Sequence, residues 1–578
     1  MPKVSNQSIA ELLREIGEYL AMQEVPFKPR AYEKAAGIIE GLEEEVADIY
    51  MRGGLKALEE IPGVGVSIAE KIEEFIKTGK VKYYEGLKKK TPVDLEGLSR
   101  VEGLGPKSIK KLYQKLGISD LADLEKAAKA GKIAKLEGFG ARSEEKILKG
   151  VAFAKRSGGR FVLGFVTPQI RSIVSHLTKL PDASRVTVAG SVRRKKETIG
   201  DADILIVSAK PKIVMDYFVS MPEVMSVIAH GDTKSSVKVK PGVNVDLRVV
   251  PAESYGAALN YFTGSKDHNV ALRQIAVKKG WKLNEYGLFS VKGAREKTIA
   301  GKTEEEIYKM FGMDYIEPEL RENTGELQAA QAHRLPKLIG YGDLQGDLQV
   351  QTNWTDGSDS IEAMAKAAAA QGLAYIAITD HTKRLAMTHG LDEKRILQQM
   401  AEIDRLNKKF AGKIKILKGS ECDILKDGTL DLPASVLSKL DVVGAAVHSH
   451  FNLTRAEQTE RIKRAMANPN VDILFHPTGR IINRREAYEV DMEAVIAHAK
   501  KTGTVLEIDA YPDRADLKDE YVRKCVEAGV KMSIDSDAHS PTHFPYLEYG
   551  IAQARRGWAE KDDIINAWPV EKMKKSLK

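Results

Sequence analysis

The spacing of apolar residues changes along the chain and predicts three kinds of structure. In residues 1–150, apolar side chains recur at helical spacing, as in ELLREIGEYLAM and SIAEKIEEFIKTG, with Gly and Pro between the segments. From about Arg160, short β-branched runs such as DADILIVS and VNVDLRVV predict strands of an α+β domain. Residues 256–318 return to mixed helix and turn, and residues 319–340 indicate a connecting segment with some helical character.

Beyond residue 340 the pattern alternates regularly between apolar strands and helices. The predicted strands are GDLQVQ, YIAIT, IKILKG, VVGAAV, DILF, TVLEI and VKMSI, separated by stretches such as SIEAMAKAAAAQGL. Strand–helix alternation predicts parallel strands, and seven of them favour a seven-stranded β/α barrel. The expected fold class is therefore multidomain, with helical domains, an α+β region and a C-terminal β/α barrel.

Composition and charge narrow the choice of function. At about 150 residues per domain, 578 residues predict roughly four folding units. The chain has two cysteines, Cys422 and Cys525, and no apolar run near the roughly 18 residues that a membrane span needs. It also begins without the pattern of a signal peptide, so we expect a cytoplasmic protein without membrane contact. Residues 51–300 hold 45 Lys+Arg against 27 Asp+Glu, which suits a polyanion. Residues 321–578 are close to neutral, and eight of the twelve histidines lie from His381 onward, which suits metal ions.

Three related segments interrupt the helices of the basic part. They are LEEIPGVGVSIAEKI (58–72), LSRVEGLGPKSIKKL (98–112) and AKLEGFGARSEEKIL (134–148), and each predicts a short helix, a Gly-x-Gly turn and a second helix. Such a turn presents backbone N–H groups to an anion, and glycine allows close approach of a phosphate. Three copies favour salt-dependent, sequence-independent DNA binding over simple helix punctuation. The repeats resemble helix-hairpin-helix motifs, which implies DNA contacts at Gly63, Gly65, Gly103, Gly105, Gly138 and Gly140.

Paired aspartates give the most specific signal of the first half. Asp201 and Asp203 lie two apart on a predicted strand, so both carboxylates face the same way, and Asp246 lies in another strand. Three converging carboxylates suit two Mg²⁺ ions that act on both oxygens of a phosphoryl transfer. A solvated strand face is the alternative for a bare D-x-D.

A Gly-Ser turn upstream of these aspartates strengthens the interpretation. Gly190 and Ser191 offer a tight turn and a hydroxyl for phosphate oxygens, and Arg193 and Arg194 supply charge to a triphosphate leaving group.

The segment VAGSVRRKKETIGDADILIV (188–207), with HGDTKSSV, YFTGSKDHNVALRQIAVKKGW and LNEYGLFSV, resembles the nucleotidyltransferase core of the family X DNA polymerases, the family of DNA polymerase beta. The resemblance covers about residues 1–318 and implies gapped or nicked DNA and deoxynucleoside triphosphates as substrates. It implies that Asp201, Asp203 and Asp246 are the metal-binding triad, with Asp246 also receiving or routing the primer 3′-hydroxyl proton. It further implies triphosphate contacts at Gly190, Ser191 and Arg194, sugar contacts at Tyr261, Phe262 and Gly264, and base-pair or template contacts at Asn269 and Arg273. Lys266 departs from the family pattern, which has an acidic residue there.

The N-terminal helices also resemble the lyase domain of this family. The resemblance implies that Lys71, in PGVGVSIAEKIEEF, is the Schiff-base nucleophile that removes a 5′-deoxyribose phosphate, with Lys28 and Tyr32 as supporting, DNA-binding residues. Ser67 replaces a lysine of the family pattern. A solvated helix lysine therefore stays open as the alternative for Lys71.

Nearly every apolar strand of the C-terminal part ends in a residue that can bind a metal. Strand ends of a β/α barrel meet at one mouth, and imidazoles with carboxylates suit Zn²⁺ or Mn²⁺, which activate water for phosphoester hydrolysis. A single buried histidine would more often be structural, but here several follow consecutive strands. The candidate ligands are Asp356, His381, Glu421, His448, His476, Asp537 and His539.

This part, with LDEKRILQQMAEIDRLN, DGTLDLP and HPTGRIINRRE, resembles the polymerase-and-histidinol-phosphatase (PHP) domain. The resemblance implies three metals. Their ligands would be Asp356, His381 and His539 for one, Glu421, His448 and His476 for another, and Glu421, Asp537 and an H-x-H pair for the third. Here Gln349 and Gln351 replace that pair, and a neutral amide is a poor substitute for imidazole. We therefore expect two or three Zn²⁺ or Mn²⁺ ions, the third weakly bound or missing.

Together these features predict a monomeric repair-type DNA polymerase that fills short gaps, joined to a 3′-5′ exonuclease or 3′-phosphodiesterase that also cuts at abasic sites. Two alternatives stay open: a DNA end-binding polymerase whose barrel is a non-catalytic scaffold, and a small-molecule phosphoesterase barrel fused to a nucleotidyltransferase. The predicted domains are a lyase-like domain (1–86), a fingers-like helix-hairpin-helix domain (87–150), a nucleotidyltransferase palm (151–255), a thumb (256–318), a linker (319–340) and a PHP nuclease domain (341–578).

Overall fold

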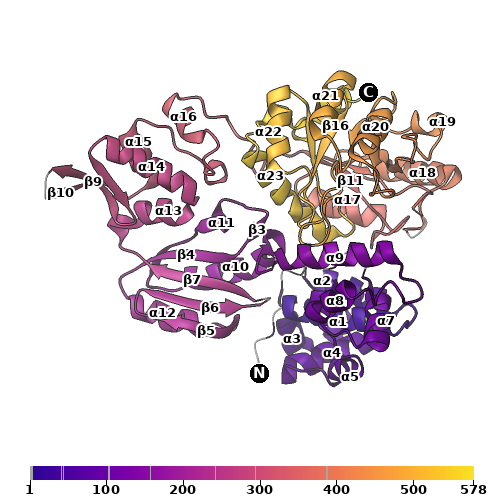
Figure 1. Cartoon of the computed structure of the whole chain (residues 1–578), viewed down its shortest axis with the longest axis horizontal. Helices are drawn as coiled ribbons and strands as arrows, with labels where there is room; N and C mark the ends of the chain where they lie inside the picture. Colours follow the sequence, from indigo (N-terminus) through magenta and orange to yellow (C-terminus); the bar gives the residue numbers. More distant parts are fainter. Residues whose placement is uncertain are drawn as a thin grey trace. The chain divides into compact units, whose positions relative to one another are not determined.

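The computed structural model describes residues 4, 6–40, 42, 44–99, 101, 104–156, 158–240, 242–292, 295–385 and 388–578. It divides into two compact units (Figure 1). The helical unit comprises residues 1–158 and 481–486, and the second unit comprises residues 159–480 and 487–578. Gly103, one of the six hairpin glycines, lies outside the described residues.

The helical unit is built from amphipathic helices around one apolar core. In α1, Ile9, Leu13, Ile16 and Leu20 are fully buried, and their spacing of four, three and four residues places them on one helix face. The described helices are α1 (Asn6–Met22), α2 (Lys28–Glu40), α3 (Val46–Glu59), α4 (Val66–Thr78), α5 (Lys82–Lys90), α6 (Leu95–Ser99), α7 (Pro106–Leu116), α8 (Leu121–Lys129) and α9 (Ala141–Arg156).

The three predicted hairpins share one turn geometry. In each, the N–H of the residue between the two glycines donates to the carbonyl three residues earlier: Val64 to Ile61 at 3.0 Å, Leu104 to Val101 at 3.0 Å, and Phe139 to Leu136 at 2.9 Å. The helix expected before the third turn is wrong, because residues 133–138 form bends and turns. The Glu144 carboxylate of α9 accepts the N–H groups of Ile133 and Ala134, which holds this segment out of a helix.

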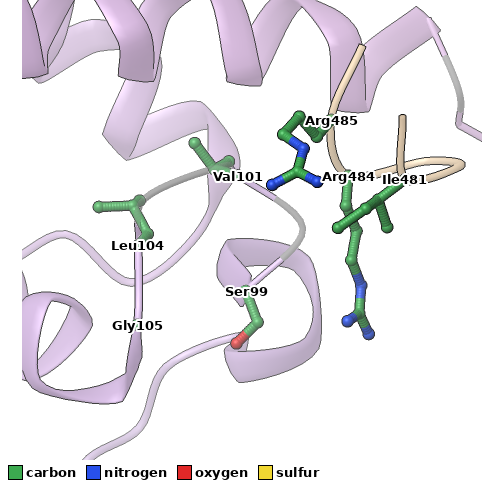
Figure 2. Close-up of a pocket in the computed structure, with 7 residues that line it drawn as sticks. All are labelled: Ser99, Val101, Leu104, Gly105, Ile481, Arg484 and Arg485. Atoms are coloured by element: carbon green, nitrogen blue, oxygen red, sulfur yellow. The ribbon is translucent and has the colours of Figure 1, made fainter. Parts of the chain in front are cut away.

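Figure 2 shows a small pocket of the helical unit beside the second hairpin. Leu104 and Gly105 come from the hairpin turn, and Arg484 and Arg485 come from the segment 481–486 that belongs to this unit. The pocket contains none of the predicted metal ligands, so the predicted chemistry lies elsewhere in the chain.

The part of the second unit predicted as the palm, called the palm region below, contains a five-stranded mixed sheet with strand order β2-β4-β7-β6-β5. The strands are β2 (Ala183–Val188), β4 (Asp201–Ser208), β5 (Val224–His230), β6 (Lys234–Val239) and β7 (Val243–Val249), and only β4 and β7 pair in parallel. Helix α10 (Leu163–Thr178) packs on β2, and α12 (Pro211–Val219) packs on β5 and β6 (Figure 1). The short strands β1 (Phe161–Val162) and β3 (Thr198–Ile199) pair beside this sheet. The strand β5 was not predicted.

The thumb region combines helices with a small antiparallel sheet of order β10-β9-β8. Its elements are η1 (Ala252–Ser254), α13 (Tyr255–Thr263), α14 (Lys266–Lys278), β8 (Trp281–Asn284), β9 (Gly287–Lys292), β10 (Arg295–Ala300) and α15 (Glu304–Phe311). The predicted connecting segment contains η2 (Pro318–Leu320) and α16 (Glu326–Gln331), and their Leu320 and Leu327 join the apolar core of the thumb region.

The C-terminal region is a parallel barrel, as predicted. Its seven strands follow one another in chain order, and a bridge between Val350 and Ala538 brings the last strand end back to the first. The strands are β11 (Gly346–Val350), β12 (Tyr375–Ile378), β13 (Lys415–Asp423), β14 (Val442–Ala446), β15 (Ile473–Leu474), β16 (Val505–Asp509) and β17 (Met532–Asp535). The helices are α17 (Ile361–Ala370), α18 (Glu393–Lys409), α19 (Ala434–Leu437), α20 (Arg455–Met466), α21 (Met492–Thr502), α22 (Asp519–Ala528), α23 (Leu547–Arg556) and α24 (Val570–Lys574).

Charged side chains connect the palm region to the barrel within the second unit. Glu197 accepts from Arg480 at 2.7 Å, and Glu548 of α23 accepts from Arg171 of α10 at 2.6 Å. At Gly164 a Cβ atom would lie 2.5 Å from Pro512, so α10 approaches the barrel too closely for any larger residue. No helix in the described part of the chain combines the length and apolar character needed to cross a bilayer.

Candidate active sites

The structure brings the three predicted carboxylates of the palm together. In the parallel pairing of β4 with β7, Asp203 lies directly opposite Asp246. Asp201 lies two residues before Asp203 on the same strand, so its side chain points to the same face. The three acids therefore lie on one face of two neighbouring strands, and carboxylate oxygens are the ligands that Mg²⁺ prefers. They are not among the described groups of acids and histidines whose ligand atoms all lie within 4.8 Å of one another.

The electrostatics of this cluster favour a bound cation. Burial, together with the charges of Asp201 and Asp246, raises the pKa of Asp203 to about 6. Burial also raises the pKa of Asp246, but hydrogen bonds from Ser236 and Lys234 and the nearby positive charges outweigh it and lower the pKa. Lys234 Nζ lies 2.9 Å from Asp246 Oδ2. Asp246 therefore stays ionised, whereas the raised pKa of Asp203 reflects its burial and its repulsion by the two neighbouring carboxylates.

The Gly-Ser turn lies directly against the aspartate strand. The Ala189 N–H donates to the Asp203 carbonyl at 2.7 Å, and Gly190 has a positive φ of 60°. A Cβ atom on Gly190 would lie 2.7 Å from Asp203 Oδ2, so glycine is required for both conformation and space. Ser191 follows in the short helix α11 (Gly190–Arg193).

The two arginines after this turn have different partners. Arg193, expected to supply charge to a triphosphate, is instead bound to the thumb region, where Glu304 accepts from it at 2.6 Å and Thr263 accepts at 2.7 Å. Arg194 donates from Nε to Glu322 at 3.0 Å and from Nη1 to the Thr263 carbonyl. Arg194 thus contacts the predicted sugar-binding segment, residues 261–264, directly.

The predicted sugar and base-pair residues form a connected group. Tyr261 and Phe262 pack edge to face with centroids 5.1 Å apart, and Gly264 has a positive φ of 71°. The Asn269 amide donates to the Tyr261 carbonyl at 2.7 Å, and the Arg273 guanidinium donates to the Asn269 carbonyl at 3.2 Å. The structure therefore fixes Asn269 against Tyr261 and leaves Arg273 exposed.

Sequence reasoning missed Arg248 as part of this site. Its guanidinium lies 4.5 Å from the centroid of Phe262, which is within range of a cation–π interaction. Arg248 lies two residues after Asp246 on β7, so the two side chains share a face of the sheet. That spacing was the available signal, and it links the aromatic pair to the carboxylate cluster.

The predicted lyase lysine lies in a small polar cluster of the helical unit. Lys71 Nζ donates to the Ser67 carbonyl at 2.8 Å and to its hydroxyl at 3.0 Å, and lies 4.8 Å from the Tyr83 ring centroid. Burial raises the pKa of Tyr32, and a side-chain hydrogen bond with Ser67 offsets part of this rise. Ser67 therefore joins Lys71 to Tyr32. Lys28 begins α2 and is exposed.

The hairpin glycines divide into two kinds. Gly63 and Gly138 have φ of 78° and 82°, which L-residues rarely adopt, so the turn itself requires them. Gly65, Gly105 and Gly140 have no positive φ, and a Cβ atom on any of them would enter open space. The fold does not demand glycine at these three positions, which is consistent with space kept for a ligand above the main chain.

The barrel gathers the predicted ligands at the ends of its strands. Ligand atoms of Asp356, His381 and His539 lie within 4.8 Å of one another, and the same holds for His381, Glu421 and His448. Glu421 is the shared centre: its Oε1 lies 3.0 Å from His448 Nε2 and 2.8 Å from His476 Nε2. Asp537 adjoins His539 at 3.7 Å.

The charges in this cluster suit cation binding. Burial alone would raise the pKa of Glu421, but the surrounding His381 and His448 outweigh it and hold the pKa well below its usual range. Burial lowers the pKa of His448, yet Glu421 and Asp423 raise it to about 9. Buried polar atoms without a hydrogen-bond partner among the described residues include Nδ1 of His381, His448 and His476 and Oδ1 of Asp537. Unsatisfied imidazole and carboxylate atoms at one site fit Zn²⁺ or Mn²⁺.

The two glutamines of the first barrel strand are buried beside these ligands. Gln351 Nε2 donates to Glu421 Oε2 at 2.8 Å, so its amide nitrogen rather than its oxygen faces the shared carboxylate. Both amide atoms of Gln349 and Oε1 of Gln351 are buried without a hydrogen-bond partner. This arrangement opposes a third cation, because Gln351 uses a lone pair of Glu421 and places a neutral amide where the family pattern has an imidazole.

Sequence reasoning also missed a layer of buried acids on the last two barrel strands. Glu507 and Asp509 of β16 and Asp535 of β17 are completely buried, and burial raises the pKa of each. Glu507 accepts the N–H of His476 at 2.5 Å and thereby fixes the loop that carries this ligand. Acidic residues inside apolar strands were the available signal.

Comparison with known proteins finds relatives of both parts of the chain. Family profiles match residues 4–81 (helix-hairpin-helix domain), 95–152 (SAM-like helix-hairpin-helix tandem), 258–322 (DNA polymerase beta thumb) and 347–568 (PHP domain). The DNA polymerase/3′-5′ exonuclease PolX of Bacillus subtilis (strain 168) is 38% identical over 99% of both chains. The chain belongs to the PolX family of family X DNA polymerases.

Two further relatives each match one part of this PolX-family chain. A probable phosphatase of Thermoanaerobacter sp. (strain X514) is 31% identical over 38% of the chain and 88% of its own length. DNA polymerase lambda of Rattus norvegicus is 24% identical over 55% of the chain and 56% of its own length. The family resemblances expected from the aspartate and histidine motifs are thus confirmed, as is the multidomain fold class with its seven-stranded PHP barrel.

Proposed function

We propose that this chain is a repair-type DNA polymerase that fills short gaps and removes nucleotides from 3′ ends with its PHP barrel. The observation that carries the proposal is the direct pairing of Asp203 with Asp246, next to Asp201 and beside the Gly190 turn. The proposed substrates are gapped or nicked DNA and deoxynucleoside triphosphates. We also propose that the protein is a cytoplasmic monomer whose domains and linker have the six residue ranges given above.

In the palm, Asp201, Asp203 and Asp246 would hold two Mg²⁺ ions. When bound, such ions stabilise the attacking and leaving oxygens of nucleotidyl transfer. Asp246 Oδ2, kept ionised by Lys234, receives or routes the proton of the primer 3′-hydroxyl. Gly190, Ser191 and Arg194 bind the triphosphate.

The incoming nucleoside would lie against the residues around α13. Tyr261, Phe262 and Gly264 line its sugar, and Asn269 and Arg273 contact the nascent base pair and the template. Support comes from the bond between Asn269 and the Tyr261 carbonyl, which fixes this surface.

In the barrel, one Zn²⁺ or Mn²⁺ ion would be held by Asp356, His381 and His539, and a second by Glu421, His448 and His476. When bound, such ions supply an activated water for attack on a phosphodiester. Asp537 adjoins this group, but the amide of Gln351 on Glu421 disfavours a third ion. The barrel then trims 3′ ends and cuts at abasic sites with two ions.

In the helical unit, the backbone N–H groups after the hairpin glycines would bind DNA phosphates, with Lys28 and Tyr32 adding contacts. Lys71 is the proposed nucleophile of a 5′-deoxyribose phosphate lyase. Its support is the polar cluster with Ser67 and Tyr83. Borohydride trapping of Lys71 on DNA with a 5′-deoxyribose phosphate tests this role, and undiminished trapping in Lys71→Ala refutes it.

Single-nucleotide gap filling with Mg²⁺ tests the polymerase. We expect extension by the unchanged chain and a loss of about 10³-fold or more in Asp203→Asn, because the substitution removes a ligand charge from the cluster. Asp216→Asn, a change of the same kind outside the cluster, is the matched control and should retain activity. The absence of extension by the unchanged chain would refute the proposal.

Digestion of a mismatched 3′ end with Mn²⁺ tests the barrel separately. We expect digestion in Asp203→Asn and its loss in Glu421→Gln, because Glu421 is shared by the imidazoles of the site. The Gln351–Glu421 bond is the observation that favours the alternative, a polymerase with a non-catalytic scaffold barrel. Binding of fewer than two metals with no digestion would establish that alternative.

A further inference from the structure

The carboxylate of Glu322, in the connecting segment after η2, is contacted by positively charged side chains from two separate regions of the second unit. One of its oxygens, Oε1, lies 3.0 Å from Arg194 Nε in the palm and 3.1 Å from Arg556 Nη1 at the end of α23 in the barrel. Lys196 Nζ adds a third cation at 3.8 Å. A single carboxylate oxygen therefore links the proposed triphosphate residue to the PHP barrel.

Arg556 is fixed by hydrogen bonds to several neighbouring groups. It is almost completely buried, with 3% of its side chain exposed, and donates from Nη2 to Asp519 Oδ2 of α22 at 2.6 Å. Its Nη1 also donates to the main-chain carbonyl of Arg194 at 3.1 Å. Arg556 thus fixes both the backbone of Arg194 and the carboxylate that orients the Arg194 guanidinium.

These contacts leave Arg194 arranged for an anion. The bonds to Glu322 and to the Thr263 carbonyl use two of the five guanidinium N–H groups and define the plane of the group. An arginine that is already ordered loses less rotamer entropy when a phosphate binds. Burial raises the pKa of Glu322, but Arg556, Lys196 and Arg194 outweigh it and lower the pKa, so the orienting group stays charged.

We infer that Glu322 is a positioning residue for the incoming triphosphate and that Arg556 of the barrel acts through it on Arg194. The inference rests on the proposed function, since Arg194 is assigned to the triphosphate there. It makes the PHP barrel a contributor to nucleotide affinity in the polymerase site, independent of any nuclease chemistry.

The neighbouring Arg555 provides a matched control. It lies on the same helix, with 10% of its side chain exposed, and donates to Glu319 at 2.8 Å and to the Ile339 carbonyl at 2.9 Å. It therefore joins α23 to the connecting segment, as Arg556 does, but through a different carboxylate and without a hydrogen bond to Arg194. Arg555→Met should loosen this junction as much as Arg556→Met without touching Glu322.

The test measures the Kd of a correct deoxynucleoside triphosphate for the full chain on gapped DNA with a dideoxy-terminated primer. We expect Arg556→Met and Glu322→Gln each to weaken binding about tenfold, as expected when a charge-assisted hydrogen bond is lost. Arg555→Met should stay within about twofold of the unchanged chain, and Arg556→Lys should recover part of the loss. Thermal unfolding and Mn²⁺-dependent 3′ digestion report whether each variant is folded.

Equal Kd values for Arg556→Met and Arg555→Met would overturn the inference, whether both are unchanged or both are weakened. If Arg556→Met does not fold, Glu322→Gln decides alone, and an unchanged Kd refutes the inference. Failure of the unchanged chain to bind a triphosphate or to fill a gap would instead refute the proposed function.

Discussion

Replacing Glu304 by Gln should destabilise the thumb, because this carboxylate holds two arginines that have little access to water. Arg193 of the palm donates to it at 2.6 Å and Arg321 at 2.5 Å, and the exposed side-chain fractions are 3% for Glu304, 16% for Arg193 and 0% for Arg321. Burial raises the pKa of Glu304, but Arg321 and Arg193 outweigh it and lower the pKa from 4.5 to about 2.

The size of the effect follows from this shift. A difference of roughly 2.5 pKa units corresponds to about 3 kcal/mol, and breaking a buried ion pair from one side costs about 3–5 kcal/mol. We therefore expect Glu304→Gln to lower the free energy of unfolding of the thumb by about 3 kcal/mol at pH 7. Because the folded pKa is depressed, the contribution is complete above pH 4.5 and is lost as the pH falls toward 2. At pH 3 the difference should shrink to about 1.4 kcal/mol.

Fluorine NMR of 5-fluorotryptophan protein during urea unfolding measures this quantity. Trp281 lies in the thumb against Phe311, with ring centroids 5.5 Å apart, so its resonance reports thumb unfolding. Glu305→Gln, the same substitution at the exposed next residue of α15, is the control and should change little. A loss below about 1 kcal/mol at pH 7, or one equal to that of the control, would refute the reasoning.

Four shorter predictions concern the other sites. Gly65→Ala and Gly105→Ala should weaken DNA binding about tenfold in a fluorescence anisotropy titration with an unchanged melting temperature, because their Cβ atoms would enter open space. Gly63→Ala should cost about 1–2 kcal/mol in urea unfolding of the helical unit, since its φ is 78°; equal stability of all three variants would contradict this distinction between the two kinds of glycine. Gln351→His should raise the bound Mn²⁺ per chain from two to three and speed 3′ digestion, and unchanged metal content would show that the amide is not the limiting group. Arg248→Met should raise the KM for the nucleotide in gap filling through loss of its contact with Phe262.

Local sequence patterns were sufficient to predict most of the fold and the aspartates of the palm region. The strands of the barrel and β4 and β7 of the palm were predictable because apolar and β-branched runs are short-range signals. Asp201 and Asp203 were predictable for the same reason, since a spacing of two on a strand fixes a shared face. The strand β5 was missed because it is largely exposed, with Met225 and Ile228 at the surface, and its pairing with β6 comes from tertiary structure.

The partners of the charged residues could not be predicted from spacing. Arg193 and Arg194 are adjacent in the sequence, yet one binds Glu304, 111 residues away, and the other binds Glu322, 128 residues away. Arg556 meets Glu322 across 234 residues. Contacts of this kind depend on how whole regions pack, and no periodic pattern in the sequence records them.

The junction between palm and barrel has a practical consequence for dissecting the chain. A fragment ending before the barrel would leave Glu197, Glu319 and Arg171 without Arg480, Arg555 and Glu548. The cut would also uncover Gly164, where α10 meets Pro512. The boundary between palm and barrel is therefore not a neutral place to separate the two parts, and shortened forms would have to be redesigned at this surface before they behave as independent proteins.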